Sequence, residues 1–184
     1  MIITTGSLKF KKINSIKNSS LRPTPNKVRL AIFNILKHKL SMDKWIKKSH
    51  VLDAFAGTGI IGFEAISRGI TNLTLVEKDK KNFSKLLQNI HTFNISNKVY
   101  ALNEDFFNIQ SLPYKYKLIY LDPPYYKDYI NKAIEKILDI NVLEKDSIII
   151  CETEKIFDFQ SKEKKKIFFS RVYGAVKITF LLYS

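Results

Sequence analysis

The chain has 184 residues, of which 45% are hydrophobic and 12% aromatic. This is enough for one domain with a core, too little for two, and argues against disorder. Its single cysteine, Cys151, excludes an intramolecular disulfide framework. No window approaches the length of a membrane span. The N-terminus lacks the basic start and long apolar stretch of a signal peptide, so we expect a cytoplasmic protein with no membrane partner.

The formal net charge of +14 is distributed unevenly along the chain. Residues 1–50 carry twelve Lys and Arg and one acid, Asp43, a net of +11, whereas residues 51–184 carry nineteen Lys and Arg and sixteen acids, a net of +3. Codon bias would spread lysine over the whole chain. A positive field at one end suits a polyanion, whose phosphates release counterions on binding. The asymmetry favours a nucleic-acid partner over a merely solvated lysine-rich surface.

The first 50 residues contain two predicted elements. Residues 1–20 alternate weakly between apolar and polar and carry a basic cluster, which predicts a short hairpin or an extended basic arm. Thr24 is a suitable N-cap residue, Pro25 fits the first helical position, and apolar residues follow at helical spacing. We therefore expect a helix over residues 25–40. Both elements would form a nucleic-acid-facing extension of a single domain over residues 1–184.

From residue 50 onward, strands alternate with helices. Strands are predicted at residues 50–55, 72–76, 98–102, 117–121 and 147–151, and helices at about 60–67, 83–90 and 128–139. Such alternation indicates an α/β fold with a mostly parallel sheet and helices on both faces. The last two predicted strands, 167–170 and 176–183, have no helix between them, which predicts an antiparallel pair at one edge. Residues 161–166 are expected to form a charged loop.

The predicted sheet has a candidate cofactor site at the end of its first strand. In doubly wound sheets ligands bind at the carboxyl ends of strands, near the switch point. Asp53 ends the first strand, and Phe55, Gly57 and Gly59 follow in the next loop. Glycines let the backbone turn sharply and let a ligand approach closely. We therefore include these four residues in the predicted cofactor site.

Acids at the ends of the next two strands extend this site. A carboxylate at Glu77 could accept both hydroxyls of a ribose. Asp105 could accept from an adenine amino group while Phe106 packs on the ring. Gly57 to Gly62 also match G-x-G-x-x-G, with Glu77 20 residues after Gly57. The pattern alone leaves a nicotinamide dinucleotide and S-adenosylmethionine open, because each presents an adenosine ribose to the same acid.

The residues that follow the fourth strand distinguish these cofactors. Asp122, Pro123, Pro124 and Tyr125 stand there in sequence. An exocyclic base amine is a poor nucleophile, because its lone pair is delocalised into the ring. The Asp122 carboxylate and the Pro123 carbonyl could accept hydrogen bonds from the N–H groups of this amine. The nitrogen could then become tetrahedral as it attacks a sulfonium methyl group. Two prolines fix the backbone, and Tyr125 offers a face for base stacking. This combination favours S-adenosylmethionine and requires no metal.

Motifs along nearly the whole chain resemble the bacterial 16S rRNA guanine-N2 methyltransferase family, within the class I methyltransferases. The matching segments are Arg22–Thr24, Val28–Leu36, Leu52–Gly59, Gly62–Ala65, Ser67–Gly69, Val76–Asp79, Leu121–Tyr125 and Arg171–Gly174. Two departures are Leu30, where the family usually has Glu, and Phe10, where its early hairpin often has Gly.

The resemblance implies a Rossmann-like, seven-stranded methyltransferase sheet with a small basic N-terminal extension. It also implies methylation of one guanine N2 in a hairpin loop of 16S rRNA, within a partly assembled small ribosomal subunit. Asp53, Gly57, Gly59, Glu77 and Asp105, with Phe55 and Phe106, would line the S-adenosylmethionine site. Asp122–Tyr125 would hold the flipped guanine. We expect a monomer.

The residues expected to contact RNA lie in the N-terminal extension. They are Lys9, Lys11, Lys12, Arg22 and Arg29. An alternative for Arg29 is pairing with an acid across the helix. The three histidines share no metal-ligand spacing, so no metal site is expected.

Two other functions remain open, and two more are disfavoured. Asp122–Tyr125 suits the amine of adenine N6 as well as that of guanine N2, so a DNA or RNA adenine-N6 methyltransferase is the nearest alternative. The chain could also be an inactive basic RNA-binding assembly protein. Protein-glutamine methylation is disfavoured, because those enzymes usually carry Asn at the position of Asp122. A nicotinamide oxidoreductase would have no use for residues 122–125.

Overall fold

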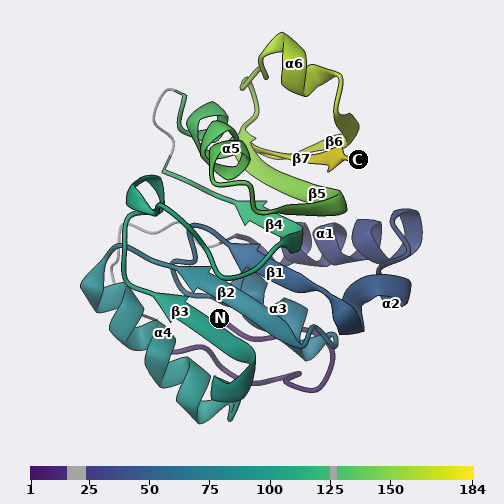
Figure 1. The fold of residues 1–184 in the computed structure, drawn as a ribbon. Helices are drawn as coiled ribbons and strands as arrows, with labels where there is room; N and C mark the ends of the chain where they lie inside the picture. The colour runs from purple at the N-terminus through teal and green to yellow at the C-terminus, as the bar shows by residue number, and fades with distance from the viewer. Residues whose placement is uncertain (16–23, 125–127) are drawn as a thin grey trace.

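The computed structural model describes residues 1–15, 24–124 and 128–184. Seven strands form one sheet in the order β3-β2-β1-β4-β5-β7-β6 (Figure 1). The strands are β1 (His50–Asp53), β2 (Asn72–Val76), β3 (Val99–Leu102), β4 (Tyr116–Leu121), β5 (Leu143–Glu154), β6 (Ile167–Tyr173) and β7 (Val176–Tyr183). The helices are α1 (Asn26–Lys39), α2 (Met42–Trp45), α3 (Ile60–Ser67), α4 (Lys80–Thr92), α5 (Tyr129–Asp139) and α6 (Ser161–Lys164), with short 3-10 turns η1 (Ile46–Lys48), η2 (Ser96–Lys98) and η3 (Phe106–Asn108).

The sheet confirms the predicted α/β architecture. Strands β3, β2, β1, β4 and β5 pair in parallel, and β7 pairs antiparallel with both β5 and β6. The reversed strand β7 therefore lies one place inside the edge strand β6. The order reverses between β1 and β4, because β2 and β3 lie on one side of β1 and the later strands on the other. Ligands bind beside such a switch point in open α/β sheets.

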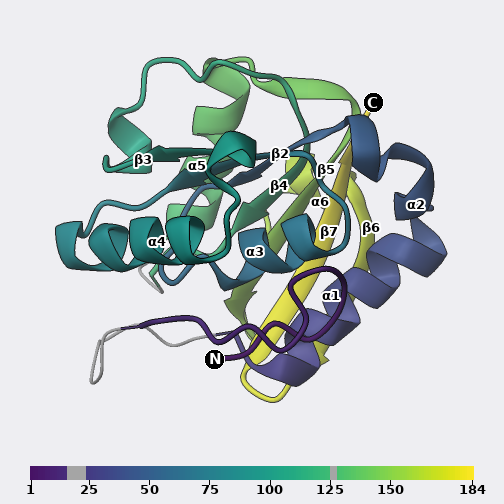
Figure 2. The same ribbon diagram turned by 90° about the horizontal axis from the view of Figure 1, so that it is seen from below.

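Helices cover both faces of the sheet (Figure 2). Apolar side chains of α1, α3 and α4 pack with one face of the strands, which contributes Val51, Leu73 and Leu118. Helix α5 packs on the other face, with Leu52, Ile119 and the free Cys151. Because successive strand residues point to opposite faces, Val51 and Leu52 belong to different cores. Burial on both faces accounts for the nearly continuous apolar runs of the central strands.

The N-terminal segment folds back on itself and packs against α3. Within residues 1–15 an antiparallel bridge joins Ile2 to Lys12, so the hairpin alternative describes this segment better than a free arm. The Leu8 amide donates to the Ser67 hydroxyl at 2.9 Å, and the Thr4 amide donates to the Glu64 carboxylate at 2.7 Å. These bonds attach the hairpin to the last turns of α3.

Three predicted local features differ from the structure. Thr24 is not an N-cap: α1 begins after Pro25, no side chain caps it, and the Thr24 hydroxyl bonds to residues of the sheet instead. The predicted charged loop at 161–166 contains the short helix α6. Strand β5 is longer than residues 147–151 at both ends: it pairs with β7 as far as Glu154, and Leu143 pairs with Tyr116 of β4.

Candidate active site

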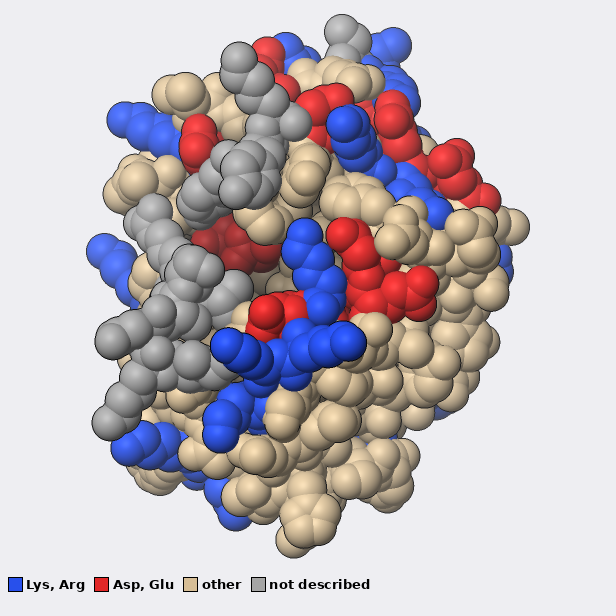
Figure 3. All heavy atoms as spheres, turned by 90° about the vertical axis from the view of Figure 1, so that its left-hand side faces the viewer, with Lys and Arg blue, Asp and Glu red and all other residues tan. Residues whose placement is uncertain are grey.

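Four acids that were predicted as site residues follow the ends of neighbouring parallel strands. Asp53 ends β1, Glu77 follows β2, Asp105 follows β3 and Asp122 follows β4. Parallel strands bring their carboxyl ends to one edge of the sheet. Figure 3 looks onto this side and shows acidic side chains set back in a hollow, with Lys and Arg side chains around it.

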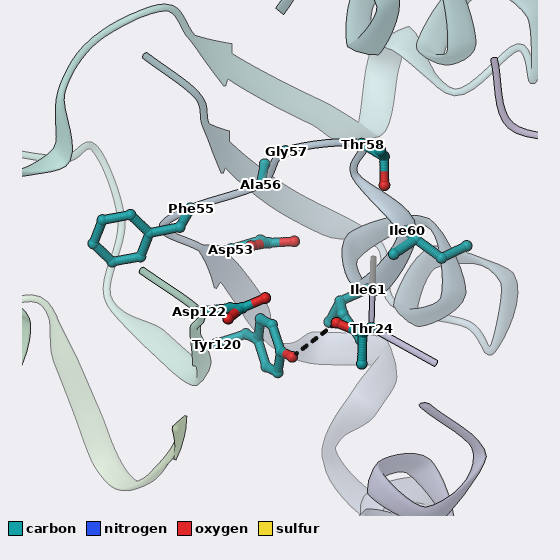
Figure 4. Close-up of a pocket in the computed structure, with 10 residues that line it drawn as sticks. All are labelled: Thr24, Asp53, Phe55, Ala56, Gly57, Thr58, Ile60, Ile61, Tyr120 and Asp122. Atoms are coloured by element: carbon teal, nitrogen blue, oxygen red, sulfur yellow. Dashed lines mark hydrogen bonds between the residues drawn. The ribbon is translucent and has the colours of Figure 1, made fainter. Parts of the chain in front are cut away.

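The hollow at this edge has a volume of about 60 Å³ and joins the two predicted halves of the site. Figure 4 shows the Asp53 and Asp122 carboxylates close to each other in it, with the glycine loop on one side. Its lining is Thr24, Asp53, Phe55, Ala56, Gly57, Thr58, Ile60, Ile61, Tyr120 and Asp122. Asp53, Phe55 and Gly57 of the predicted cofactor site thus share one hollow with Asp122.

The glycine loop is held by backbone conformation and by Glu77. Gly57 and Gly59 have φ angles of 52° and 76°, a region that favours glycine. A Cβ on Gly59 would lie 2.7 Å from a ring carbon of Phe63. The Gly57 amide donates to Oε2 of Glu77 at 2.7 Å, and the Asp79 amide donates to Oε1 at 2.7 Å. Glu77 therefore connects β2 to the loop after β1.

The Glu77 carboxylate remains able to accept further hydrogen bonds. Its exposed fraction is 8%, and burial raises its pKa, an effect that the two backbone donors oppose. Each carboxylate oxygen has two lone-pair sites, so one amide per oxygen leaves room for a hydroxyl donor. The position is thus compatible with the predicted contact to a ribose.

Burial strongly perturbs the Asp53 carboxyl group in the hollow. Its side chain is 2% exposed, and Oδ1 has no hydrogen-bond partner among the described residues. Burial raises its pKa to about 7, the backbone amides of Gly62 and Phe55 lower it, and the charge of Glu77 raises it further. A buried carboxylate with an unfilled acceptor site is a binding position for a cationic or N–H donor group.

The predicted adenine contacts of Asp105 and Phe106 agree only partly with the structure. Asp105 precedes η3, accepts from the Phe107 amide at 3.1 Å and lies 3.6 Å from the Lys78 ammonium. Its carboxylate is at the surface, with an exposed fraction of 35%. The prediction that Phe106 packs on a bound ring is wrong for this conformation, because Phe106 is 1% exposed and belongs to the core under Phe55. Phe55, which is partly exposed, lines the hollow instead.

The residues after β4 are described as far as Pro124. Asp122 is half-buried, Pro123 is buried and Pro124 is exposed. Tyr125 lies outside the described residues. Asp122 contributes to the raised pKa of the neighbouring Tyr120 phenol, although burial and Glu152 contribute more.

A buried polar group under this strand end was not predicted from the sequence. The hydroxyls of Thr24 and Tyr120 both donate to Oε2 of Glu152, the former at 3.1 Å, and they lie 3.4 Å apart (Figure 4). All three side chains are at most 4% exposed. The acid Glu152 within an apolar strand is the one signal in the sequence that could have indicated this group.

The structure separates the residues expected to contact RNA into two kinds. Lys9, Lys11 and Lys12 are exposed. Arg29 is 1% exposed and donates to the carbonyls of Thr24 and Ile2 at 3.2 and 2.9 Å. Burial leaves Arg29 no surface for RNA, so this prediction is corrected. Its alternative, pairing with an acid, is closer to the structure, although Glu64 at 3.9 Å belongs to α3. Arg22 lies outside the described residues.

Two other features are absent from residues 1–15, 24–124 and 128–184. No group of three or more His, Cys, Asp or Glu side chains in them is arranged to hold a metal ion. Within the same residues, no helix combines the length and apolar character that crossing a membrane requires.

Solved structures with the same fold define its class. A putative methyltransferase from Escherichia coli matches with a TM-score of 0.81 and 21% identity, over 100% of this chain and 98% of that one. An RNA methyltransferase from Salinibacter ruber, solved in complex with S-adenosyl-L-homocysteine, matches with a TM-score of 0.64 and 16% identity, over 88% and 93%. The fold is that of the Rossmann-like class I methyltransferases.

Sequence comparison identifies the family within this class. The family model "conserved hypothetical protein 95" matches residues 1–182. The ribosomal RNA small subunit methyltransferase D of Buchnera aphidicola is 37% identical over 154 residues, which cover 83% of this chain and 78% of that protein. The chain belongs to the conserved hypothetical protein 95 family, in which it is similar to ribosomal RNA small subunit methyltransferase D. The family predicted from the sequence motifs is thereby confirmed.

Proposed function

We propose that the protein methylates the exocyclic N2 amine of a guanine in 16S rRNA, with S-adenosylmethionine as the methyl donor. The substrate would be a partly assembled small ribosomal subunit, and the protein would act as a monomer. One observation carries the proposal: Asp122 opens into the same hollow as Asp53 and the Gly57 loop. A base amine held by Asp122 would thus lie beside a cofactor held by the loop.

The residues of the hollow fit S-adenosylmethionine. The unpartnered Oδ1 of Asp53 offers an acceptor to a cationic amino-acid group, and the positive φ angles of Gly57 and Gly59 let a ligand lie against the backbone. Glu77 has acceptor sites for ribose hydroxyls. The bound product S-adenosyl-L-homocysteine in the Salinibacter ruber enzyme is a further argument for this cofactor. When bound, S-adenosylmethionine supplies an electrophilic methyl group on a sulfonium.

Asp122 and Pro123 would act on the other reactant. The Asp122 carboxylate and the Pro123 carbonyl would accept hydrogen bonds from the two N–H groups of the amine. This would bring the nitrogen lone pair out of conjugation with the ring. S-adenosylmethionine would supply the methyl group to this nitrogen, and the Asp122 carboxylate would accept the proton that the methylated nitrogen loses. Alignment and charge complementarity would supply most of the acceleration. Tyr125 is proposed to stack on the base.

The proposal is tested by transfer of radiolabelled methyl groups from S-adenosylmethionine to small ribosomal particles that lack the modification, followed by nucleoside analysis of the RNA. Labelled N2-methylguanosine is the expected product. Labelled N6-methyladenosine would preserve the proposed cofactor and overturn the proposed base. Absence of label, with calorimetric binding of the cofactor intact, would overturn the proposed substrate. Absence of both would leave the inactive RNA-binding protein as the better description.

A further inference from the structure

Phe10 is an exposed aromatic residue in a strained conformation. Its exposed fraction is 76%, and its φ angle is 70°. A side chain with a Cβ rarely adopts positive φ, and strain of this kind collects at functional sites. The backbone conformation at this position therefore suits glycine better than phenylalanine. The residue combines an apolar surface in water with an unfavourable backbone conformation.

The backbone around Phe10 is fixed by hydrogen bonds. The Phe10 amide donates to the Ile3 carbonyl at 2.9 Å, and the Ile3 amide donates to the Lys11 carbonyl at 3.0 Å. Ile3 and Leu8, on either side of the turn, are buried, and Leu8 is attached to α3 through Ser67. The exposed ring thus projects from an ordered hairpin, so that little entropy would be lost on binding.

The surroundings of the ring are basic. The Lys9 ammonium lies 4.6 Å from the Phe10 ring centroid, and Lys11 and Lys12 are exposed on the same hairpin. No acid occurs in the first 42 residues. An exposed aromatic ring on a lysine-rich segment is a combination with which proteins bind single-stranded nucleic acid, through base stacking and phosphate neutralisation together.

One buried side chain connects this hairpin to the hollow. The Arg29 guanidinium donates to the carbonyl of Ile2 and to the carbonyl of Thr24. Ile2 pairs with Lys12 across the hairpin, and Thr24 lines the hollow. Arg29 thus links the strands of the basic hairpin to one wall of the candidate active site by hydrogen bonds.

We propose that Phe10 stacks on an unpaired base of the RNA substrate, while Lys9, Lys11 and Lys12 neutralise the adjacent phosphates. The inference rests on the proposed function, because it assigns an RNA contact to the same enzyme. Charge complementarity favours RNA over a protein partner, since three exposed lysines on the same hairpin would oppose a dry apolar interface.

The test compares Phe10→Leu, Phe10→Gly and Phe10→Tyr in the full chain, with Phe168→Leu as the control. Phe168 is another exposed phenylalanine, 45% exposed on β6. Binding is measured by fluorescence anisotropy with a labelled RNA hairpin that carries an unpaired loop, and with a fully paired duplex of the same length. Urea unfolding and calorimetric binding of S-adenosylmethionine are measured on each variant.

We expect Phe10→Leu and Phe10→Gly to weaken binding of the loop RNA about tenfold, the loss of one stacked base. Binding of the duplex and of the cofactor should not change, and Phe10→Tyr should keep the affinity. Phe10→Gly should unfold at the same or a higher urea concentration, because glycine relieves the strain. The Leu and Gly variants should weaken binding at every salt concentration without changing the salt slope. Exchange of the three lysines for glutamine should flatten that slope.

Equal affinity of the wild type and Phe10→Leu for the loop RNA would overturn the inference. So would a loss confined to protein-containing particles and absent with the bare loop RNA, since this would identify a protein partner. Methyl transfer by the wild type, measured in parallel, separates this result from the proposed function. Transfer with no effect of Phe10 refutes only the stacking role, whereas loss of loop binding without any transfer refutes the proposed function and leaves the RNA contact standing.

Discussion

The strand-end site and the N-terminal hairpin use charged residues in opposite ways. At the strand ends, Asp53 is buried with an acceptor oxygen that no described residue fills. In the N-terminal region, Arg29 is as deeply buried, but two of its nitrogens donate to carbonyls and a third lies near Glu64. One charge is left available in a hollow, and the other joins parts of the fold.

The comparison shows that sequence position and charge do not identify a binding residue. Arg29 and Lys11 both belong to the strongly basic first quarter of the chain, yet only Lys11 is exposed. Burying a polar group costs little free energy when hydrogen-bond partners surround it. Unfilled capacity for hydrogen bonds inside a hollow is therefore the better sign of a ligand, and exposure the better sign of an RNA contact.

The largest expected effect is that of Asp122→Ala, which removes the proposed acceptor from the strand-end site. We expect the rate of methyl transfer to fall roughly a thousandfold, about 4 kcal/mol of transition-state stabilisation, because the amine loses its charged acceptor. The affinity for S-adenosylmethionine should change little. Single-turnover transfer and calorimetry measure the two quantities. Asp139→Ala, which removes an exposed acid at the end of α5, is the control. A fully active Asp122→Ala would refute the assigned role.

The second prediction concerns the buried arginine of the N-terminal region. Arg29→Met should lower the free energy of unfolding by about 3 kcal/mol. The change leaves buried carbonyls without donors and removes one of the positive charges beside the buried Glu64 carboxylate. Lys27→Met, at an exposed position of the same helix, should have almost no effect. Urea denaturation measures both variants. Equal stability of the two would mean that the buried guanidinium does not stabilise the fold.

The position of the strand-end residues could be predicted from the sequence, because they follow apolar strands in a repeated pattern. Asp53, Glu77 and Asp122 each stand where an apolar strand ends, and parallel pairing is sufficient to bring them together. No side-chain contact had to be known in advance. Phe106 was misplaced because the local sequence after β3 does not show that its ring is buried in the core.

Features that depend on distant contacts could not be predicted. Thr24 resembles an N-cap in its local sequence, but its hydroxyl bonds to Glu152, 128 residues away. Arg29 is buried because the hairpin covers it, and the hairpin is held by bonds to residues about 60 positions further on. In both cases tertiary contacts, and not the local sequence, determine where the side chain lies. A single sequence gives only weak signals of such contacts, for example an acid inside an apolar strand.

The third prediction uses pH to probe Asp53, the carboxyl group with an acceptor oxygen that no described residue fills. The pKa of Asp53 is about 7 in the folded protein against an ordinary value of 3.8, so the folded state holds a proton that the unfolded state has lost between those values. The cofactor-free protein should therefore lose stability as pH rises from 5 to 8, with roughly 2 kcal/mol of the loss due to Asp53. Asp53→Asn should remove this part.

Urea unfolding of wild type and Asp53→Asn at pH 5 and pH 8 isolates the contribution of this group, because Glu77 and other acids are common to both proteins. The difference between the two proteins should grow with pH in favour of the variant. A difference that is constant with pH would mean that Asp53 is ionised throughout, with its charge compensated in the fold, and the contrast with Arg29 would disappear.

The smallest effect is expected for Glu77→Gln, which tests whether one acid serves both the fold and the ligand. Glutamine keeps one acceptor oxygen but loses the charge and an acceptor of one of the two backbone amides that Glu77 now binds. We expect calorimetric affinity for S-adenosylmethionine to fall about tenfold, ~1.4 kcal/mol, because charged acceptors bind hydroxyls more strongly than neutral ones. Glu104→Gln, at an exposed position near Asp105, is the control. Unchanged affinity together with lowered stability would assign Glu77 wholly to the Gly57 loop, and would place it with Arg29 among the charges that hold the fold.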